Sequence, residues 1–304
     1  MVKPDLRVKI GSLELKNPVT VASGTFGSGE EYKNLVNLDK LGAIITKSIT
    51  LGPREGNPPP RLVETAYGML NSIGLQNDGV DAFIKDKVPF LNKLKTAVIV
   101  SIAAHSVEDY AELAKRLDGV NRVDAIEINI SCPNVKGGLE FSREPGSAAE
   151  VVRAVRAASK KPLITKLSPN VKDITEIAAA AEGAGSDAVS LVNTFTGMAI
   201  DIDKRAPVLG NTVGGLSGPA IKPIALRMVW ETARKVKIPV IGIGGIMDYK
   251  DALEFIIAGA SAIQIGTANF VNPKAATEMI DGISGYMRKN KINNMKELTG
   301  CLKI

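Results

Sequence analysis

The feature that most restricts the fold is a regular alternation of short apolar runs and amphipathic segments along nearly the whole chain. Eight runs of four to six residues are rich in Val, Ile, Ala and Leu. Runs this apolar on both faces are typical of strands in a parallel sheet, which is covered on both sides. The expected strands are Val19–Ala22, Ala43–Thr46, Ala97–Ile102, Ala125–Ile130, Leu163–Leu167, Ala188–Val192, Pro239–Gly242 and Ala262–Ile265.

Most of these runs precede a segment with apolar residues at three- and four-residue steps, which predicts a helix. Eight strand–helix units match a (β/α)8 TIM barrel of roughly 250 residues, whose binding residues lie at the C-terminal ends of the strands. A doubly wound fold would need GxGxxG spacing after its first strand, and Ser23–Gly27 lacks it. We therefore predict one barrel domain over residues 1–304. The expected helices are Val107–Leu117, Ala148–Ala158, Ile174–Ala184, Ile221–Val236 and Tyr249–Ala258.

Three segments lie outside this repeat. Leu6–Ile10 and Leu13–Leu15, separated by Gly11-Ser12, predict a hairpin that covers the N-terminal end of the barrel. Ile49–Asn77 and Phe195–Pro219 are predicted as long loops. Long loops in compact domains are usually functional, and on a barrel both would lie on the catalytic face.

Composition excludes several classes of protein. The net charge is +6, but basic and acidic residues are interspersed and aromatic residues make up only 4%, so we expect no nucleic-acid partner. Two cysteines are too few for a disulfide framework, and no N-terminal segment resembles a signal peptide. Apolar stretches stop short of the ~18 to 20 residues of a membrane span. We expect a reduced, cytoplasmic enzyme that is not in a membrane.

Polar residues or glycines follow nearly every expected strand. Two glycine-rich turns, Gly244-Gly245 and Gly266-Thr267, follow strands seven and eight, where barrels commonly bind phosphate through backbone N–H groups. Lys47 and Lys166 end two other strands in apolar surroundings, where each needs an anionic or electron-rich partner. Three amide side chains are expected to hydrogen-bond to a ring that carries both carbonyl and N–H groups: Asn71, Asn129 and Asn193.

Cys132 lies just beyond the fourth strand, where a thiol can act as a nucleophile, act as a general base or remain an inert buried group. Its ordinary pKa of about 8.5 suits a base that removes a carbon-bound proton near neutral pH. We expect no metal site, because only His105 and the distant Cys301 could join Cys132 and no ligand spacing is present. His105 is interpreted as a capping or surface residue, which disfavours a Cys/His hydrolase.

Taken together, these motifs resemble class 1 dihydroorotate dehydrogenases, and the resemblance extends over nearly the whole chain. The forms CPNVKGG and GLSGPAIKP are most similar to the type 1B catalytic subunit. The segments that carry the resemblance are Thr46–Ser48, Asn71–Asn77, Ser131–Gly138, Thr165–Asn170, Val192–Thr194, Gly214–Pro223, Gly242–Ile246 and Gln264–Thr267.

The resemblance implies FMN-dependent oxidation of (S)-dihydroorotate to orotate in pyrimidine (UMP) synthesis, with Cys132 as the base at C5 and hydride transfer from C6 to flavin N5. It places Lys166 near flavin N1. The implied substrate-binding residues are Lys47, Asn71, Ser72, Ile73, Gly74, Leu75, Asn129, Asn193 and Thr194. The implied FMN-binding residues are Ser23, Lys47, Ser48, Ser101, Asn129, Lys166, Val192, Gly218, Gly244, Gly245, Gly266 and Thr267. Ser101 departs from the family, where many members carry Asn, so this contact is expected to be lost or bridged by water.

The type 1B resemblance also implies a homodimer associated with a subunit that carries FAD and an iron–sulfur cluster and passes electrons to NAD+. This chain has two cysteines and cannot supply the four ligands of such a cluster. Three alternatives stay open: a fumarate-dependent type 1A enzyme, a flavoenzyme similar to dihydropyrimidine dehydrogenase that acts on uracil or thymine, and a non-catalytic barrel that binds a phosphorylated ligand.

Overall fold

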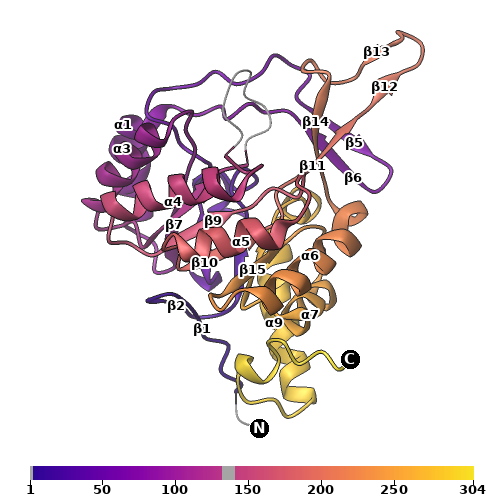
Figure 1. Ribbon diagram of the computed structural model, residues 1–304. Helices are drawn as coiled ribbons and strands as arrows, with labels where there is room; N and C mark the ends of the chain where they lie inside the picture. The colour runs from indigo at the N-terminus through magenta and orange to yellow at the C-terminus, as the bar shows by residue number, and fades with distance from the viewer. Residues whose placement is uncertain (1–2, 132–140) are drawn as a thin grey trace.

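A closed barrel of eight parallel strands forms the centre of the computed structural model, which describes residues 3–131 and 141–304 (Figure 1). The predicted (β/α)8 barrel is confirmed, and each expected strand agrees with an observed one to within one residue at either end. In chain order the barrel strands are β3 (Val19–Val21), β4 (Ala43–Ile45), β7 (Ala97–Ile102), β8 (Ala125–Asn129), β9 (Leu163–Lys166), β10 (Ala188–Leu191), β15 (Val240–Ile243) and β16 (Ala262–Ile265).

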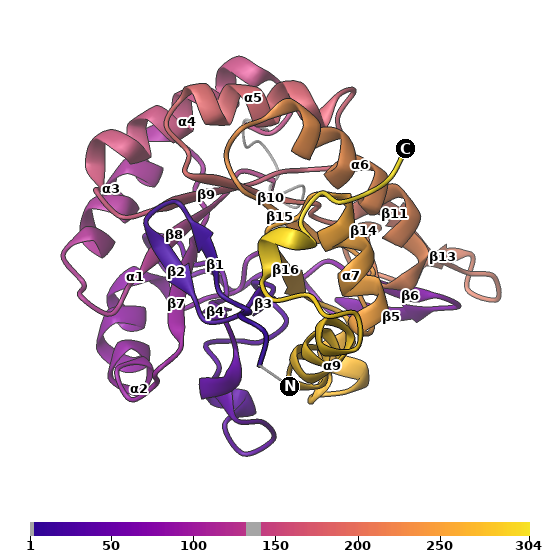
Figure 2. The same ribbon diagram turned by 90° about the horizontal axis from the view of Figure 1, so that it is seen from below.

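Helices surround the barrel as an outer ring (Figure 2). α4 begins three residues before its expected start, at Pro145, because the fixed φ of proline suits the first turn of a helix. Asp248 caps α7 by accepting hydrogen bonds from Lys250 N and Asp251 N. The helices are α1 (Gly79–Ala82), α2 (Val88–Leu91), α3 (Val107–Asp118), α4 (Pro145–Ala158), α5 (Ile174–Gly183), α6 (Lys222–Lys235), α7 (Tyr249–Ala258), α8 (Ala268–Val271) and α9 (Ala275–Lys289).

The predicted N-terminal hairpin is present and lies across the N-terminal end of the barrel (Figure 2). Strands β1 (Val8–Ile10) and β2 (Leu13–Leu15) pair antiparallel, and both strands contribute side chains to the hydrophobic core. A side chain at Gly11, in the turn, would lie 2.8 Å from Asp187 Cβ, so the turn packs directly against the residue that precedes β10.

The prediction of two long loops is wrong in part, because each segment contains strands. Residues 49–77 contribute β5 (Leu62–Thr65) and β6 (Gly68–Asn71), and residues 195–219 contribute β11 (Phe195–Met198) and β14 (Val213–Ser217). These form one antiparallel sheet in the order β11-β14-β6-β5. Two glycines in β14 and the largely exposed β5 leave no alternating apolar pattern that would reveal them. Two further short strands, β12 (Ile200–Asp201) and β13 (Ala206–Pro207), project from this sheet in Figure 1.

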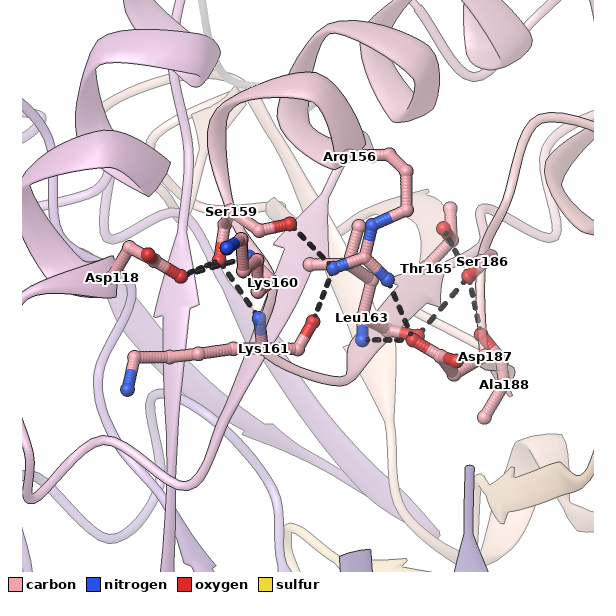
Figure 3. Close-up of polar contacts among 10 residues, drawn as sticks. All are labelled: Asp118, Arg156, Ser159, Lys160, Lys161, Leu163, Thr165, Ser186, Asp187 and Ala188. Carbon is pink, nitrogen blue, oxygen red and sulfur yellow. Dashed lines mark hydrogen bonds and ion pairs between the residues drawn. The ribbon is translucent and has the colours of Figure 1, made fainter. Parts of the chain in front are cut away.

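At the N-terminal end of the barrel, a polar network joins the end of α4 to the starts of β9 and β10 (Figure 3). Arg156 donates to the carboxylate of Asp187 and to the backbone carbonyls of Ser159 and Lys161. Asp187 also accepts from the backbone N–H of Leu163 at 2.8 Å. Polar groups at this end of a barrel serve stability rather than chemistry.

We expect Arg156→Leu to lower the free energy of unfolding by about 1–3 kcal/mol, because it removes the guanidinium that donates to the Asp187 carboxylate and to two backbone carbonyls. Urea unfolding followed by circular dichroism measures the change. The control is Arg227→Ala, which removes an exposed i,i+4 pair with Glu231 and should cost no more than about 0.5 kcal/mol. Equal losses in the two variants would contradict a stabilising role for the network.

Candidate active site

A cavity of about 240 Å³ lies at the C-terminal ends of the barrel strands. Residues of the β5–β6 segment and of β14 also line it, so both long inter-strand segments lie on this face, as predicted. The residues expected from sequence to bind a ligand that line this cavity are Ser23, Lys47, Ser48, Asn71, Ile73, Gly74, Leu75, Asn129, Lys166, Val192, Asn193, Thr194, Gly218, Gly244, Gly245, Gly266 and Thr267.

A chain of polar side chains lies along one wall of the cavity. The Asn193 amide donates to Asn129 Oδ1 at 3.4 Å, and the Asn129 amide donates to Ser48 Oγ at 3.2 Å. Ser48 Oγ in turn shares a hydrogen bond of 2.9 Å with Ser101 Oγ. Ser101 is fully buried behind Ser48 and does not line the cavity. The shorter residue at this position therefore supports a cavity residue instead of reaching the ligand space itself.

Two lysines from different strands line the same cavity. Lys166 has only 6% of its side chain exposed, and its ammonium donates to Ser23 Oγ at 3.2 Å. Lys47 follows β4, and its Nζ lies 3.7 Å from the position that a Cβ atom on Gly24 would occupy. Two lysines facing one partly enclosed space make the potential there positive, which favours an anionic or electron-rich ligand.

The glycine turns after β15 and β14 come close together at another part of the cavity. Gly245 has φ +73°, and a Cβ there would lie 2.7 Å from Lys222 Cβ and 2.9 Å from the carbonyl oxygen of Gly218. Gly218 has φ +95°, a backbone conformation that residues with a side chain rarely adopt. The turns therefore require glycine, and they leave bare backbone facing the cavity, as backbone anion sites require.

Lys222 is a neighbour of this turn that the sequence analysis did not single out. It forms ion pairs with Asp251 at 2.6 Å and Glu254 at 3.0 Å. Burial would lower the pKa of Lys222, but its hydrogen bonds to these two carboxylates outweigh burial and raise the pKa. Lys222 thus stays charged beside the glycine turn.

Besides Ser101, two described residues singled out from sequence, Ser72 and His105, do not line the cavity. Ser72 is fully buried; its backbone carbonyl accepts from the Asn57 side chain, and its backbone N–H donates to the carbonyl of Arg61. His105 contacts Arg54 outside the cavity, which agrees with its interpretation as a surface residue. Cys132 lies outside the described residues. Its neighbour Ser131 is buried, and Ser131 Oγ donates to the carbonyl of Lys166 at 2.9 Å. The chain leading to Cys132 is therefore held at the cavity end of β9.

Sequence reasoning missed several lining residues. Gln264 was part of a motif interpreted through its glycine, yet its side chain lines the cavity and donates to Glu127 Oε2 at 2.7 Å. Met69 and Phe270 are apolar lining residues that no local pattern distinguishes from core residues. Within residues 3–131 and 141–304, no group of three His, Cys, Asp or Glu side chains could hold a metal ion, and no helix is long and apolar enough to cross a membrane.

Comparisons with known proteins match this chain to one protein family. A sequence profile described as dihydroorotate dehydrogenase matches residues 5–287. A protein of Trichlorobacter lovleyi is 59% identical over 303 residues, which is 99% of this chain and 100% of that relative. One of Geobacter sulfurreducens is 59% identical over 305 residues, covering 100% of both chains. One of Desulforamulus reducens is 58% identical over 301 residues, covering 99% of both chains. All three are named dihydroorotate dehydrogenase B (NAD(+)), catalytic subunit.

Proposed function

Because the chain belongs to the dihydroorotate dehydrogenase family, most similar to its type 1B catalytic subunits, we propose that it oxidises (S)-dihydroorotate to orotate in pyrimidine synthesis, with FMN as cofactor. The observation that carries the proposal is the convergence on one cavity of two lysines, three asparagine amides and the glycine turns. This set suits a flat ring with carbonyl and N–H groups, an anionic substituent and a phosphate.

The cavity fits FMN on two features of the structure itself. The turns at Gly218, Gly244 and Gly245 form a cradle that a Cβ would fill, as a phosphate site requires. Gln264 Oε1 is buried without a hydrogen-bond partner within the described part of the chain, so a donor on a bound ring would satisfy it. When bound, FMN supplies the acceptor for the hydride that leaves C6 of the substrate. Lys166 would place positive charge beside the ring, and Gly244 and Gly245 would hold the phosphate.

The chain's own residues supply the other half of the oxidation. We assign to the Cys132 thiolate the removal of the proton from C5, so that the C5–H and C6–H bonds break, the C5–C6 double bond forms and two electrons leave with the hydride. Lys47 would pair with the substrate carboxylate. The amides of Asn71, Asn129 and Asn193 would hydrogen-bond to the carbonyl and N–H groups of the pyrimidine ring. The bond between Asn193 and Asn129 holds these two amides in one orientation.

Anaerobic stopped-flow absorbance tests the proposal directly. The purified chain, loaded with FMN, is mixed with dihydroorotate, and the flavin band near ~450 nm is followed. We expect rapid bleaching with dihydroorotate and none with dihydrouracil, which lacks the carboxylate that Lys47 would bind. Bleaching by dihydrouracil alone would select the dihydropyrimidine dehydrogenase alternative. A chain that cannot be loaded with FMN would contradict the flavoenzyme assignment.

We further propose that NAD+ is the final acceptor and that a second subunit, carrying FAD and an iron–sulfur cluster, delivers the electrons to it. The name of the relatives, catalytic subunit, supports a second subunit. Exposed apolar side chains, Tyr67 (75%) in the β5–β6 turn and Ile202 (82%) between β12 and β13, also support association. We propose a homodimer joined to that subunit in the cytoplasm. NAD+ reduction should require the added subunit; rapid fumarate reduction by the isolated chain would favour type 1A.

We expect Gly245→Ala to weaken FMN binding by at least about tenfold, because the methyl group would lie 2.9 Å from the Gly218 carbonyl in a left-handed backbone conformation. Quenching of flavin fluorescence on titration measures the dissociation constant. The control is Gly285→Ala in α9, where the methyl group would meet no atom within 4 Å and FMN binding should not change. Equal dissociation constants in the two variants would contradict a phosphate cradle at Gly245.

A further inference from the structure

Glu127 is a fully buried carboxylate inside the barrel, below the cavity. It lies on β8 two residues before Asn129, which lines the cavity. Its Oε2 accepts hydrogen bonds from Gln264 at 2.7 Å and from Ser190 at 3.2 Å. Its Oε1 is buried and has no hydrogen-bond partner within the described residues. A half-satisfied carboxylate in the barrel interior is costly, so its retention calls for an explanation.

The cation described beside Glu127 is Lys166, whose Nζ lies 3.9 Å from Glu127 Oε1. That distance is too long for a hydrogen bond but short for two charges in a buried site. The ammonium donates instead to Ser23 Oγ on the cavity wall. A purely structural ion pair is expected to close to a direct hydrogen bond, because only then is the desolvation of both charges offset. Here the ammonium is held between the carboxylate below and the cavity above.

Among the described residues, three side chains make a polar contact with Glu127, and two of them also line the cavity. These two are Lys166 and Gln264, whereas Ser190 is fully buried in β10 and does not line the cavity. A change at Glu127 therefore reaches the ligand through two residues without Glu127 itself touching the ligand space. Removing its negative charge would leave the charge of Lys166 uncompensated toward the cavity.

We propose that Glu127 is a positioning residue that sets, through Lys166, how strongly the cavity favours a negatively charged ligand, and that it thereby holds the potential of bound FMN low. This inference rests on the proposed function. Reduction adds negative charge to a flavin more readily where the local positive charge is larger. Glu127, by neutralising part of the Lys166 charge, opposes reduction and eases the passage of electrons onward to the next acceptor.

The test is the midpoint potential of FMN bound to Glu127→Gln, measured by anaerobic dye titration of the loaded chain. Glutamine keeps the shape and can still accept from Gln264. We expect the potential to rise, with the ratio of the dissociation constants for oxidised and reduced FMN increasing about tenfold, which is about 30 mV for a two-electron couple. Lys166→Met is expected to lower the potential instead.

A double-mutant cycle separates action through Lys166 from a direct effect. In the Lys166→Met background, Glu127→Gln should leave the potential nearly unchanged. The same rise in both backgrounds, or no rise in Glu127→Gln alone, would overturn the inference. If Glu127→Gln does not fold, Glu127→Asp replaces it, because drawing the carboxylate back should raise the potential less but in the same direction; an unchanged potential would again overturn it.

The outcomes also separate this inference from the proposed function. A wild-type chain that binds no FMN would overturn both. A wild-type chain that binds FMN and is bleached by dihydroorotate, together with a variant of equal potential, would overturn only the role of Glu127.

Discussion

Cys132→Ser is expected to slow the reduction of bound flavin by dihydroorotate about 10²- to 10⁴-fold, the range typical of a lost general base. A serine hydroxyl has nearly the same size as a thiol but hardly ionises near neutral pH, so it cannot accept the C5 proton unless another group activates it. FMN content should not change, since none of the residues proposed to hold the phosphate is altered. The measurement is the single-turnover rate of bleaching, which separates this step from delivery to the acceptor.

Cys132 lies outside the described residues, but the residue before it is anchored by two hydrogen bonds. Ser131 is anchored to the carbonyl of Lys166, and its backbone N–H donates to Asn129 Oδ1 at 3.2 Å. Ser131 is therefore held between two residues that line the cavity. Cys301→Ser is the matched control, because Cys301 is exposed near the C-terminus and should leave the bleaching rate unchanged. A normal rate in Cys132→Ser would remove Cys132 from the role of base.

The second large effect is expected from Lys166→Met, which should weaken FMN binding about 10- to 100-fold and lower the flavin potential. Lys166 is almost completely buried and lines the cavity, so its charge acts there with little screening by water. Because reduced flavin gains more from this charge than oxidised flavin, reduced FMN should lose more affinity. Fluorescence titration and dye-coupled reduction measure the two changes.

Loss of Lys166 also leaves Glu127 without its neighbouring cation, which should lower stability, by up to about 3–5 kcal/mol for a broken buried pair. Combining Lys166→Met with Glu127→Gln should recover part of that stability. Lys161→Met is the control for loss of a lysine, since Lys161 lies just before the N-terminal end of β9, away from the cavity, and donates to the carbonyls of Val120 and Val123. Equal FMN affinity and potential in the Lys161 and Lys166 variants would contradict the role of Lys166.

The barrel could be predicted from sequence because burial on both faces is recorded locally in each strand. β4 and β15 consist only of Ala, Ile, Val and Gly, a pattern typical of strands covered on both faces in a parallel sheet. Polar residues that interrupt such a run at its C-terminal end must lie where parallel strands end together. For this reason the strand pattern alone assigns Lys47, Asn129 and Lys166 to one face of the barrel, and all three do line one cavity.

The sequence by itself therefore determined the barrel, the hairpin beneath it and the set of strand ends that share a face, since each depends on the local period of apolar residues. Tertiary structure alone decided which distant segments meet. It paired β14 with β6, placing Gly215 opposite Asn71, and it hid Ser101 behind Ser48. It also set Glu127 beneath Lys166. These contacts join residues far apart in the chain, and their energy depends on the positions of both partners in space, which no periodicity within either segment records.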